Sequence, residues 1–233
     1  MNKNELIESL TKQNRLLNID IIENLKHEEI ELIYMYDKGC LIENQGTQLI
    51  SFEDKSKIKN FDEKIDKSKI IVVHQEFYKE HLIKNGYTVL SSCHQATFEK
   101  SSFCLDLPND VVIKYLTLNN LDFVFSLYNK FIDRDGLKER IQNKKMFGIF
   151  YQGKIAGFIG WHHEGAIGML EIDKEFRRRH FATYLEKFII NKQLEELKTP
   201  YCQIIDGNEK SMSLQKKLGF SFAKEMIFWM KKL

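Results

Sequence analysis

Apolar residues recur at two different periods along the chain, and these periods predict strands and helices. Alternation with polar residues, or a short unbroken apolar run, is typical of a β-strand, whereas recurrence every three or four positions is typical of an amphipathic helix. Strands are expected over residues 30–36, 40–43, 47–52, 70–74, 87–98, 112–116, 146–151, 155–162, 166–172, 202–206 and 222–230. Helices are expected as two short segments within 4–27, over 76–84, 121–128 and 137–143, from near Phe181, and after Asn208.

The order of these elements predicts a mixed α/β fold, with a mostly antiparallel sheet and flanking helices. Short turns at 37–39 and 44–46 join the early strands, as in an antiparallel meander. Later strands are separated by helices that can cover the sheet. The segment 106–110, which contains Pro108, is the expected linker. It divides the chain into an amino-terminal domain, residues 1–107, and a carboxy-terminal domain, residues 108–233.

A faint internal repeat indicates that these two halves are related. The first half has, in order, a strand at 70–74, a helix, a Gly-Tyr pair at 86–87 and a strand. The second half repeats this order with a strand at 203–206, a helix, a Gly-Phe pair at 219–220 and a strand. The alternative is that two unrelated α/β modules share this order by coincidence.

Residues 168–183 place an apolar strand, three consecutive arginines and the start of an amphipathic helix in immediate succession. The first N–H groups of a helix have no intrahelical partner and carry partial positive charge, and Arg177, Arg178 and Arg179 add full charges beside them. The junction therefore predicts a phosphate site. A solvated charge run or a nucleic-acid contact is the alternative interpretation. The sequence contains neither a Gly-x-x-x-x-Gly-Lys loop nor a Gly-x-Gly-x-x-Gly fingerprint, which disfavours mononucleotide and dinucleotide folds.

This junction resembles motif A of the GNAT superfamily of N-acyltransferases, a strand followed by Arg/Gln-x-x-Gly-x-Gly/Ala. Arg177 and Ala182 match the motif, whereas His180 replaces its first glycine. Glycine suits such a loop because it permits positive φ, so a histidine there is expected to cost about 1 kcal/mol of strain or to reshape the loop.

A second segment, residues 208–220, resembles motif B of the same superfamily, Asn-x-x-Ala-x-x-Leu-Tyr-x-Lys-x-Gly-Phe. Asn208 is expected to cap the helix and Gly219 to end it in the left-handed conformation. Gln215 replaces the motif's tyrosine. The resemblance covers about residues 110–233, and some tandem members of the superfamily carry a related amino-terminal half. At the position equivalent to the arginines, the first half has Glu-Asp-Lys-Ser-Lys at 53–57. The first half is therefore not expected to bind acyl-CoA.

The resemblance implies an acetyltransferase that transfers an acetyl group from acetyl-CoA to a primary amine of a small molecule, an amino acid or a peptide. The amine would attack directly in a ternary complex. Acetyl-CoA is the implied co-substrate, with no metal, and a homodimer is compatible with this interpretation. The implied cofactor-binding residues lie on the strand, the turn and the two helix starts: Leu170, Ile172, Arg177, Arg178, Arg179, His180, Phe181, Ala182, Thr183 and Asn208.

Glu171 is the first candidate for the catalytic base, because it interrupts an apolar strand next to the expected thioester. An exposed strand residue without a catalytic role is the alternative. His162 and His163 are second candidates. Gln215 has no acidic proton near neutral pH, so the general acid is left open, with Tyr184 and Tyr201 as replacements by residue type alone.

The amino-acid composition narrows the classes of binding partner and the cellular compartment that we expect for the protein. The formal net charge is +2, which gives no global attraction to nucleic acid. The four cysteines lack metal-ligand spacing and are expected to be reduced thiols. The sequence shows no apolar segment long enough to predict a membrane span or a signal peptide, so we expect a cytoplasmic enzyme. A non-catalytic acyl-CoA-binding sensor or interaction module is the alternative function, and nucleic-acid binding through the arginines is a third hypothesis.

Overall fold

The computed structural model describes residues 1–27, 29–128 and 132–232. The chain forms two compact units. Unit 1 comprises Met1–Glu99, His163–Gly165 and the residues from Tyr201 onward, and unit 2 comprises Lys100–His162 and Ala166–Pro200. This division differs from the predicted halves, because the last part of the chain lies in unit 1. The predicted relationship of residues 1–107 to residues 108–233 stays a prediction.

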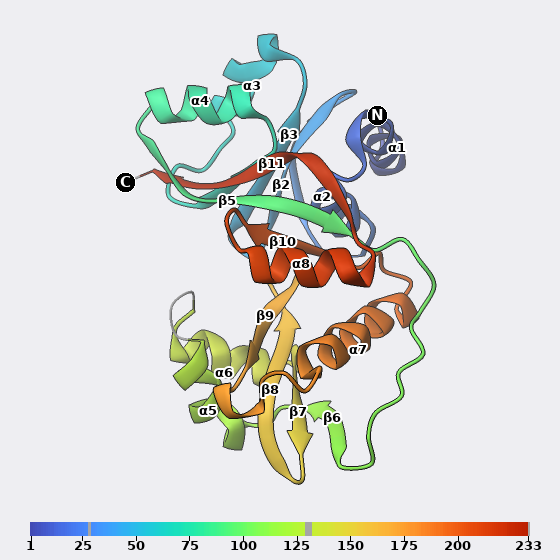
Figure 1. Cartoon of the computed structure of the whole chain (residues 1–233). Helices are drawn as coiled ribbons and strands as arrows, with labels where there is room; N and C mark the ends of the chain where they lie inside the picture. The colour runs from blue at the N-terminus through green and yellow to red at the C-terminus, as the bar shows by residue number, and fades with distance from the viewer. Residues whose placement is uncertain (28, 129–131, 233) are drawn as a thin grey trace. The chain divides into compact units, whose positions relative to one another are not determined.

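Unit 1 is a sheet covered by helices on both faces (Figure 1). Its strands lie in the order β1-β2-β3-β4-β11-β5-β10, and only β3 and β4 are parallel among the pairs described. The strands are β1 (Glu31–Tyr36), β2 (Gly39–Asn44), β3 (Thr47–Phe52), β4 (Ile70–Val73), β5 (Tyr87–Thr97), β10 (Tyr201–Ile205) and β11 (Ser221–Lys232). The helices are α1 (Lys3–Asn14), α2 (Ile19–His27), α3 (Ile58–Asp62), α4 (Glu76–Lys84) and α8 (Glu209–Leu218), with a 3₁₀ turn η1 at Lys55–Lys57.

The two helical layers follow from the alternation of side chains along the strands. On β4, Val72 packs with the apolar faces of α1 and α2, whereas Ile71 and Val73 pack with α3 and α4 on the opposite face. All three are almost fully buried. A continuous apolar run was therefore required here, because both faces of this strand are covered.

The last strands of the two sequence halves are exchanged within unit 1. From the second half, β11 pairs antiparallel with both β4 and β5 and so lies between two strands of the first half. From the first half, β5 pairs on its other side with β10, where Thr97 lies opposite Tyr201. The sheet of unit 1 is therefore built from strands of both halves.

Unit 2 is an antiparallel sheet in the order β9-β8-β7-β6, formed by β6 (Val111–Tyr115), β7 (Met146–Tyr151), β8 (Lys154–Trp161) and β9 (Ile167–Ile172). The 3₁₀ turn η2 (Leu118–Asn120), α5 (Leu121–Leu127) and α6 (Arg134–Gln142) belong to this unit, and α5 and α6 pack on Met146, Phe158 and Met169. The long helix α7 (Phe181–Glu195) packs against β7, β8 and β9 (Figure 1). Its Phe188 ring meets the Phe147 ring edge-on at 5.0 Å.

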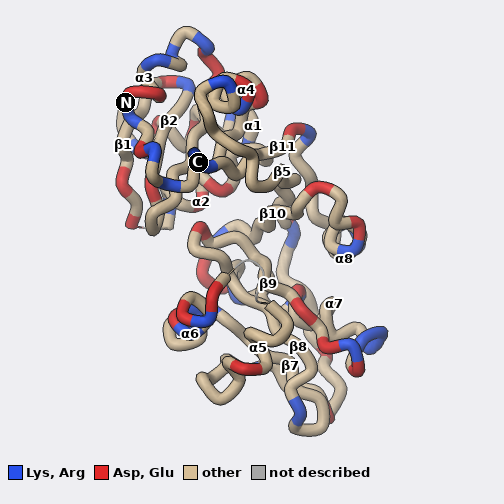
Figure 2. The backbone as a smooth tube through the Cα atoms, turned by 90° about the vertical axis from the view of Figure 1, so that its left-hand side faces the viewer, with Lys and Arg blue, Asp and Glu red and all other residues tan. Residues whose placement is uncertain are grey.

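The predicted fold class is confirmed, and most predicted elements agree with the structure to within two residues. Two details were wrong or missed: α6 begins at Arg134, before the predicted residue 137, and the lysine-rich stretch 55–67 contains η1 and α3. Basic residues (Lys and Arg) and acidic residues are interspersed along the described chain (Figure 2). Among the helices of the described residues, none is both long and apolar enough to cross a bilayer.

Candidate functional site

Strand β9 contains a bulge just before its end. Its register with β8 pairs Gly168 with Gly160 and Glu171 with Phe158, so three steps on β9 oppose two on β8. Met169 takes up the extra residue at φ 56°, a left-handed value that is rare for a residue other than glycine. A bulge re-aims the side chains that follow it and disrupts the ladder locally. The pairing with β8 resumes at Glu171 and Ile172.

After β9 the chain makes a short cationic turn before α7. The 3₁₀ turn η3 (Lys174–Phe176) is capped by Asp173, whose side chain accepts a hydrogen bond from the Glu175 N–H at 3.0 Å. His180 is the N-cap residue of α7 and adopts φ 61°, ψ 11°. Its carbonyl accepts the first bond of the helix, from the Tyr184 N–H at 3.0 Å. The N–H groups of residues 181–183 precede that bond and point out of the helix end.

Backbone strain is concentrated in this segment. Among the described residues, seven other than glycine have positive φ: Gln45, Lys144, Gln152, Met169, Arg178, His180 and Leu197. Gln45 and Gln152 precede glycines in hairpin turns, and Lys144 and Leu197 follow helix ends. Of the remaining three, Met169 lies in β9, and Arg178 (φ 63°) and His180 lie in the turn that joins β9 to α7. Strained residues of this kind persist where a surrounding structure holds them, and they cluster at functional sites.

The three arginines of the turn have different surroundings. Arg177 donates a hydrogen bond from Nε to the carbonyl oxygen of Ile172 at 3.1 Å. The Arg179 guanidinium lies 4.9 Å from the centroid of the Tyr151 ring, in a cation–π contact. Arg178 is exposed and makes no hydrogen bond, ion pair or ring contact with any residue that the structure describes. It is therefore the arginine with its full donor set available to a ligand.

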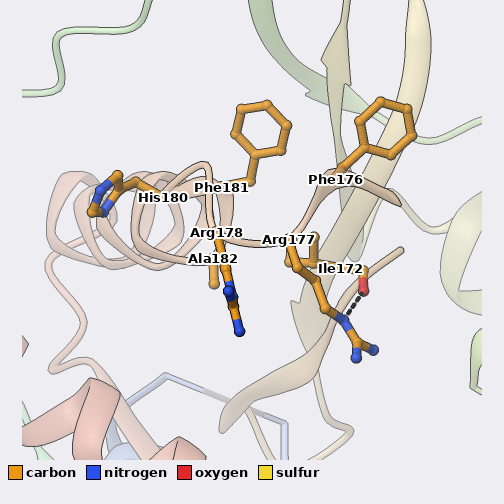
Figure 3. Close-up of a pocket in the computed structure, with 7 residues that line it drawn as sticks. All are labelled: Ile172, Phe176, Arg177, Arg178, His180, Phe181 and Ala182. Carbon is orange, nitrogen blue, oxygen red and sulfur yellow. Dashed lines mark hydrogen bonds between the residues drawn. The ribbon is translucent and has the colours of Figure 1, made fainter. Parts of the chain in front are cut away.

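A pocket of about 460 Å³ opens at this turn. It is lined by Ile172, Phe176, Arg177, Arg178, His180, Phe181 and Ala182. Figure 3 shows the side chains of Arg177 and Arg178 on one side of the turn and the rings of Phe176 and Phe181 on the other. The pocket thus combines two guanidinium groups, outward N–H groups at a helix start and an apolar wall, which is a suitable set for an anion attached to an apolar or aromatic group.

Six of the ten predicted cofactor-binding residues line this pocket, and the other four do not. Leu170, Arg179 and Thr183 belong to the same strand, turn and helix without lining it. Asn208 lies in unit 1. Phe176 was missed by the sequence interpretation, although an aromatic residue within a run of charges was a visible signal.

Glu171, the candidate base, directly precedes Ile172 of the pocket and is half-buried. The second candidates have structural contacts. The His162 ring packs against Gly168, so that a Cβ at that glycine would overlap the imidazole. His163 is exposed, and its ring contacts the side-chain oxygen of Gln45 within unit 1. Neither histidine lines the pocket, and a role for either as the base stays a prediction.

The second motif forms the predicted helix ends in unit 1. Asn208 caps α8 by accepting a hydrogen bond from the Ser211 N–H at 3.2 Å. Gly219 ends the helix at φ 90°, and the Phe220 N–H donates to the Gln215 carbonyl at 3.1 Å. Gln215 itself is only 2% exposed. Tyr201, suggested as a replacement acid, is also buried, and its hydroxyl donates to the carbonyl oxygen of Glu164.

The cysteines are free thiols, of which Cys104 is exposed and Cys40, Cys93 and Cys202 are buried. Burial raises the pKa of the Cys93 thiol to about 11. Within the described residues no group of three or more histidines, cysteines or acidic residues is placed to hold a metal ion.

Comparisons with known proteins match both the site-bearing segment and the whole fold. Residues 146–229, which contain the turn and the second motif, match the family model of FR47-like protein. A Drosophila protein of known structure is 16% identical, with a TM-score of 0.68 over 99% of this chain and 87% of that chain. A GCN5-related N-acetyltransferase from Kribbella flavida is 10% identical, with a TM-score of 0.62 over 94% of each chain.

A tandem GNAT protein from the clavulanic acid biosynthesis pathway is 12% identical, with a TM-score of 0.52 over 99% of this chain and 96% of that chain. The comparison with curated proteins gave no match. The fold and the site thus define a mixed α/β protein with a cationic turn between a bulged strand and a helix. This is the fold of solved structures named as GCN5-related N-acetyltransferases and as a tandem GNAT protein, so the fold that the resemblance implied is confirmed.

Proposed function

We propose that the protein is an acyl-CoA-dependent N-acyltransferase, which transfers an acetyl group from acetyl-CoA to a primary amine of a small molecule, an amino acid or a peptide. The observation that carries the proposal is the pocket at the arginine turn, where Arg178 has no partner among the described residues and points to the same side as Arg177.

The residues of the turn fit the diphosphate of coenzyme A. Arg177 and Arg178 provide two cationic side chains, and the α7 start provides outward N–H groups. His180 adopts φ 61°, ψ 11°, the left-handed region that a glycine enters without strain. Phe176 and Phe181 provide the apolar wall.

Bound acyl-CoA supplies a thioester, whose carbonyl carbon is open to attack by an amine. In this proposal the bulged end of β9, at Leu170 and Ile172, offers backbone N–H groups to polarise that carbonyl. Glu171 takes the proton that the attacking amine must lose. No acidic side chain is assigned to the departing thiolate, because Gln215 stands in the motif's tyrosine position. A thiol of ordinary pKa, about 8.5, is a tolerable leaving group without one.

The alternative function is a non-catalytic acyl-CoA sensor. The specific observation in its favour is Gln215, a buried amide where the superfamily motif has an ionisable hydroxyl. A sensor needs the pocket but neither a base nor an acid, so the two functions differ in turnover and agree in binding.

The deciding experiment has a binding arm and a turnover arm. The first measures heat of binding and the shift in melting temperature with acetyl-CoA, CoA and adenosine diphosphate. The second follows thiol release from acetyl-CoA with a panel of amines, amino acids and short peptides. Binding with amine-dependent thiol release supports the acyltransferase, and binding without release on any amine supports the sensor. No binding of acetyl-CoA or CoA overturns both.

A further inference from the structure

One tyrosine of unit 2 contacts three residues of the segment 176–181. Tyr151 is the last residue of β7, and its ring centroid lies 6.3 Å from that of Phe176 and 5.7 Å from that of Phe181. The Arg179 guanidinium lies 4.9 Å from the same centroid. Tyr151 is not among the described residues that line the pocket. Its ring therefore packs on the segment that forms the site, outside the space that a ligand would occupy.

The sheet of unit 2 sets the position of the Tyr151 ring. The tyrosine pairs with Val111 of β6 on one side and with Lys154 of β8 on the other. The side-chain amide of Gln152 donates a hydrogen bond to the Tyr151 hydroxyl at 3.2 Å. A residue with strand partners on both sides is held by two ladders. Its ring therefore offers a fixed surface against which the segment 176–181 can pack.

The contacts with this ring lie on both sides of each strained residue of the turn. Phe176 precedes Arg178, Arg179 separates Arg178 from His180, and Phe181 follows His180. Arg178 and His180 adopt φ 63° and 61°. Left-handed residues other than glycine persist where the surrounding structure over-determines them. The Tyr151 ring supplies contacts of this kind, because it meets the chain before, between and after the two residues.

The conformation of the turn decides where its free cationic groups point. Figure 3 shows the rings of Phe176 and Phe181 on one side of the turn and the side chains of Arg177 and Arg178 on the other. If Arg178 took an ordinary negative φ, its side chain would leave the direction that it now shares with Arg177. The contacts of the two phenylalanine rings with Tyr151 thus favour the arrangement in which both arginines line the pocket.

We propose that Tyr151 is a positioning residue, whose ring holds the cationic turn in the conformation that binds the diphosphate of acyl-CoA. This inference rests on the proposed function for the identity of the ligand. With the ring present, the turn of the ligand-free protein is already in its binding conformation. Without the ring, the turn samples other conformations, and the apparent dissociation constant rises in inverse proportion to the fraction of molecules that stays competent.

The first test is calorimetric titration of the full chain with acetyl-CoA, at a temperature at which wild type, Tyr151→Leu and Tyr151→Phe are all folded. Phenylalanine keeps the ring, so its dissociation constant is expected to stay within about twofold of wild type. Leucine removes the ring. Its dissociation constant is expected to rise about tenfold, as when about one tenth of the molecules stay competent. Wild-type affinity in Tyr151→Leu overturns the proposal.

Tyr115→Leu is the matched control. Tyr115 is the last residue of β6, its ring stacks on that of Phe147 at 4.5 Å, and the Lys144 Nζ atom lies 5.9 Å from its centroid. It thus combines an aromatic and a cationic contact within unit 2, as Tyr151 does, but neither contact involves the turn. Tyr115→Leu is expected to bind acetyl-CoA with wild-type affinity. A loss of affinity equal to that of Tyr151→Leu overturns the proposal.

Hydrogen exchange of the ligand-free protein separates this proposal from the proposed function. The N–H groups of Phe176 and Tyr184 donate to the carbonyls of Asp173 and His180, each at 3.0 Å, and so report the closed turn. NMR is expected to find both amides exchanging about tenfold faster in Tyr151→Leu, and at the wild-type rate in Tyr151→Phe and Tyr115→Leu.

The two measurements have distinguishable failures. Unchanged exchange at both amides in Tyr151→Leu overturns the role of Tyr151, whether or not acetyl-CoA binds. A wild-type protein that binds no acetyl-CoA overturns the proposed function. In that case faster exchange in Tyr151→Leu still supports the ring as the group that holds the turn.

Discussion

The Nε atom of Arg177 donates a hydrogen bond to the carbonyl oxygen of Ile172 at 3.1 Å. This bond connects the cationic turn back to the last residue of β9, across the whole of η3. Arg179 lies over the ring of Tyr151. The two outer arginines are therefore engaged with neighbouring residues, whereas Arg178 makes no such contact with the described residues.

Replacement of Arg178 by alanine is expected to weaken acetyl-CoA binding by about 10-fold to 100-fold, since a hydrogen bond to a charged group is worth roughly 1.5–3 kcal/mol. Arg179→Ala removes the same formal charge but a group already engaged with Tyr151, so its loss should be smaller. Calorimetric titration at one fixed salt concentration measures both. Equal losses for the two variants would show that only total charge matters.

Glu171→Gln is expected to lower the rate of amine-dependent thiol release by about 10²-fold to 10⁴-fold, the usual contribution of a general base. The amide keeps the shape of the side chain, so acetyl-CoA affinity should not change. Glu175→Gln is the control, because Glu175 is an exposed residue of η3 in the same acidic and basic segment. A Glu171 variant with full activity would remove this residue from the mechanism.

Substitutions of His180 test its left-handed conformation. In His180→Gly the relief of strain, about 1–2 kcal/mol, is offset by the added freedom of the unfolded chain, about 0.5–1 kcal/mol. The variant should stay within about 1 kcal/mol of wild type and still bind acetyl-CoA. His180→Val should lose about 2 kcal/mol, because a β-branched residue resists positive φ. Thermal unfolding in the absence of ligand measures both, and equal stabilities would contradict the φ of 61°.

The thiols should label in two classes. Burial raises the pKa of Cys93 to about 11, so at pH 8 it is protonated as well as inaccessible, whereas Cys104 is exposed. Iodoacetamide at pH 8 should modify Cys104 first, and all four cysteines only in denaturant. Because the folded pKa of Cys93 is raised, its contribution to stability is complete below the ordinary thiol value and is lost as the pH rises toward 11. Mass spectrometry of labelled peptides measures the order in which the cysteines are modified. Early labelling of Cys93 would contradict the predicted order.

Local features of the fold could be predicted from the sequence because each depends on a few neighbouring residues. The Asn208 cap and the Gly219 helix end are examples, since a capping side chain and a left-handed glycine act within one turn. The helix α3 had a local signal too. Ile58, Phe61 and Ile65 follow helical spacing and pack in the core, but the surrounding lysines obscured the pattern.

Other features could not be predicted because they join distant residues. The pairing of β11 with β4 and β5 leaves no mark in the pattern of any single strand. The contact between His74 and Asp20 spans 54 positions. At the site, the left-handed residue of the bulge is Met169 and not a glycine, so the sequence does not indicate the bulge. Three identical arginines in a row do not predict that Arg177, Arg178 and Arg179 have different surroundings.

The exchange of strands also sets the order in which the protein can be completed during synthesis. Residues 98–220 separate β5 from β11 along the chain, so the ribosome exposes β4 and β5 long before the strand that lies between them is made. Until then the nascent amino-terminal half carries two sheet edges without partners, and such edges are sites of aggregation. A stop codon placed just before Ser221 would therefore leave β4 and β5, which had been translated first, without the strand that lies between them.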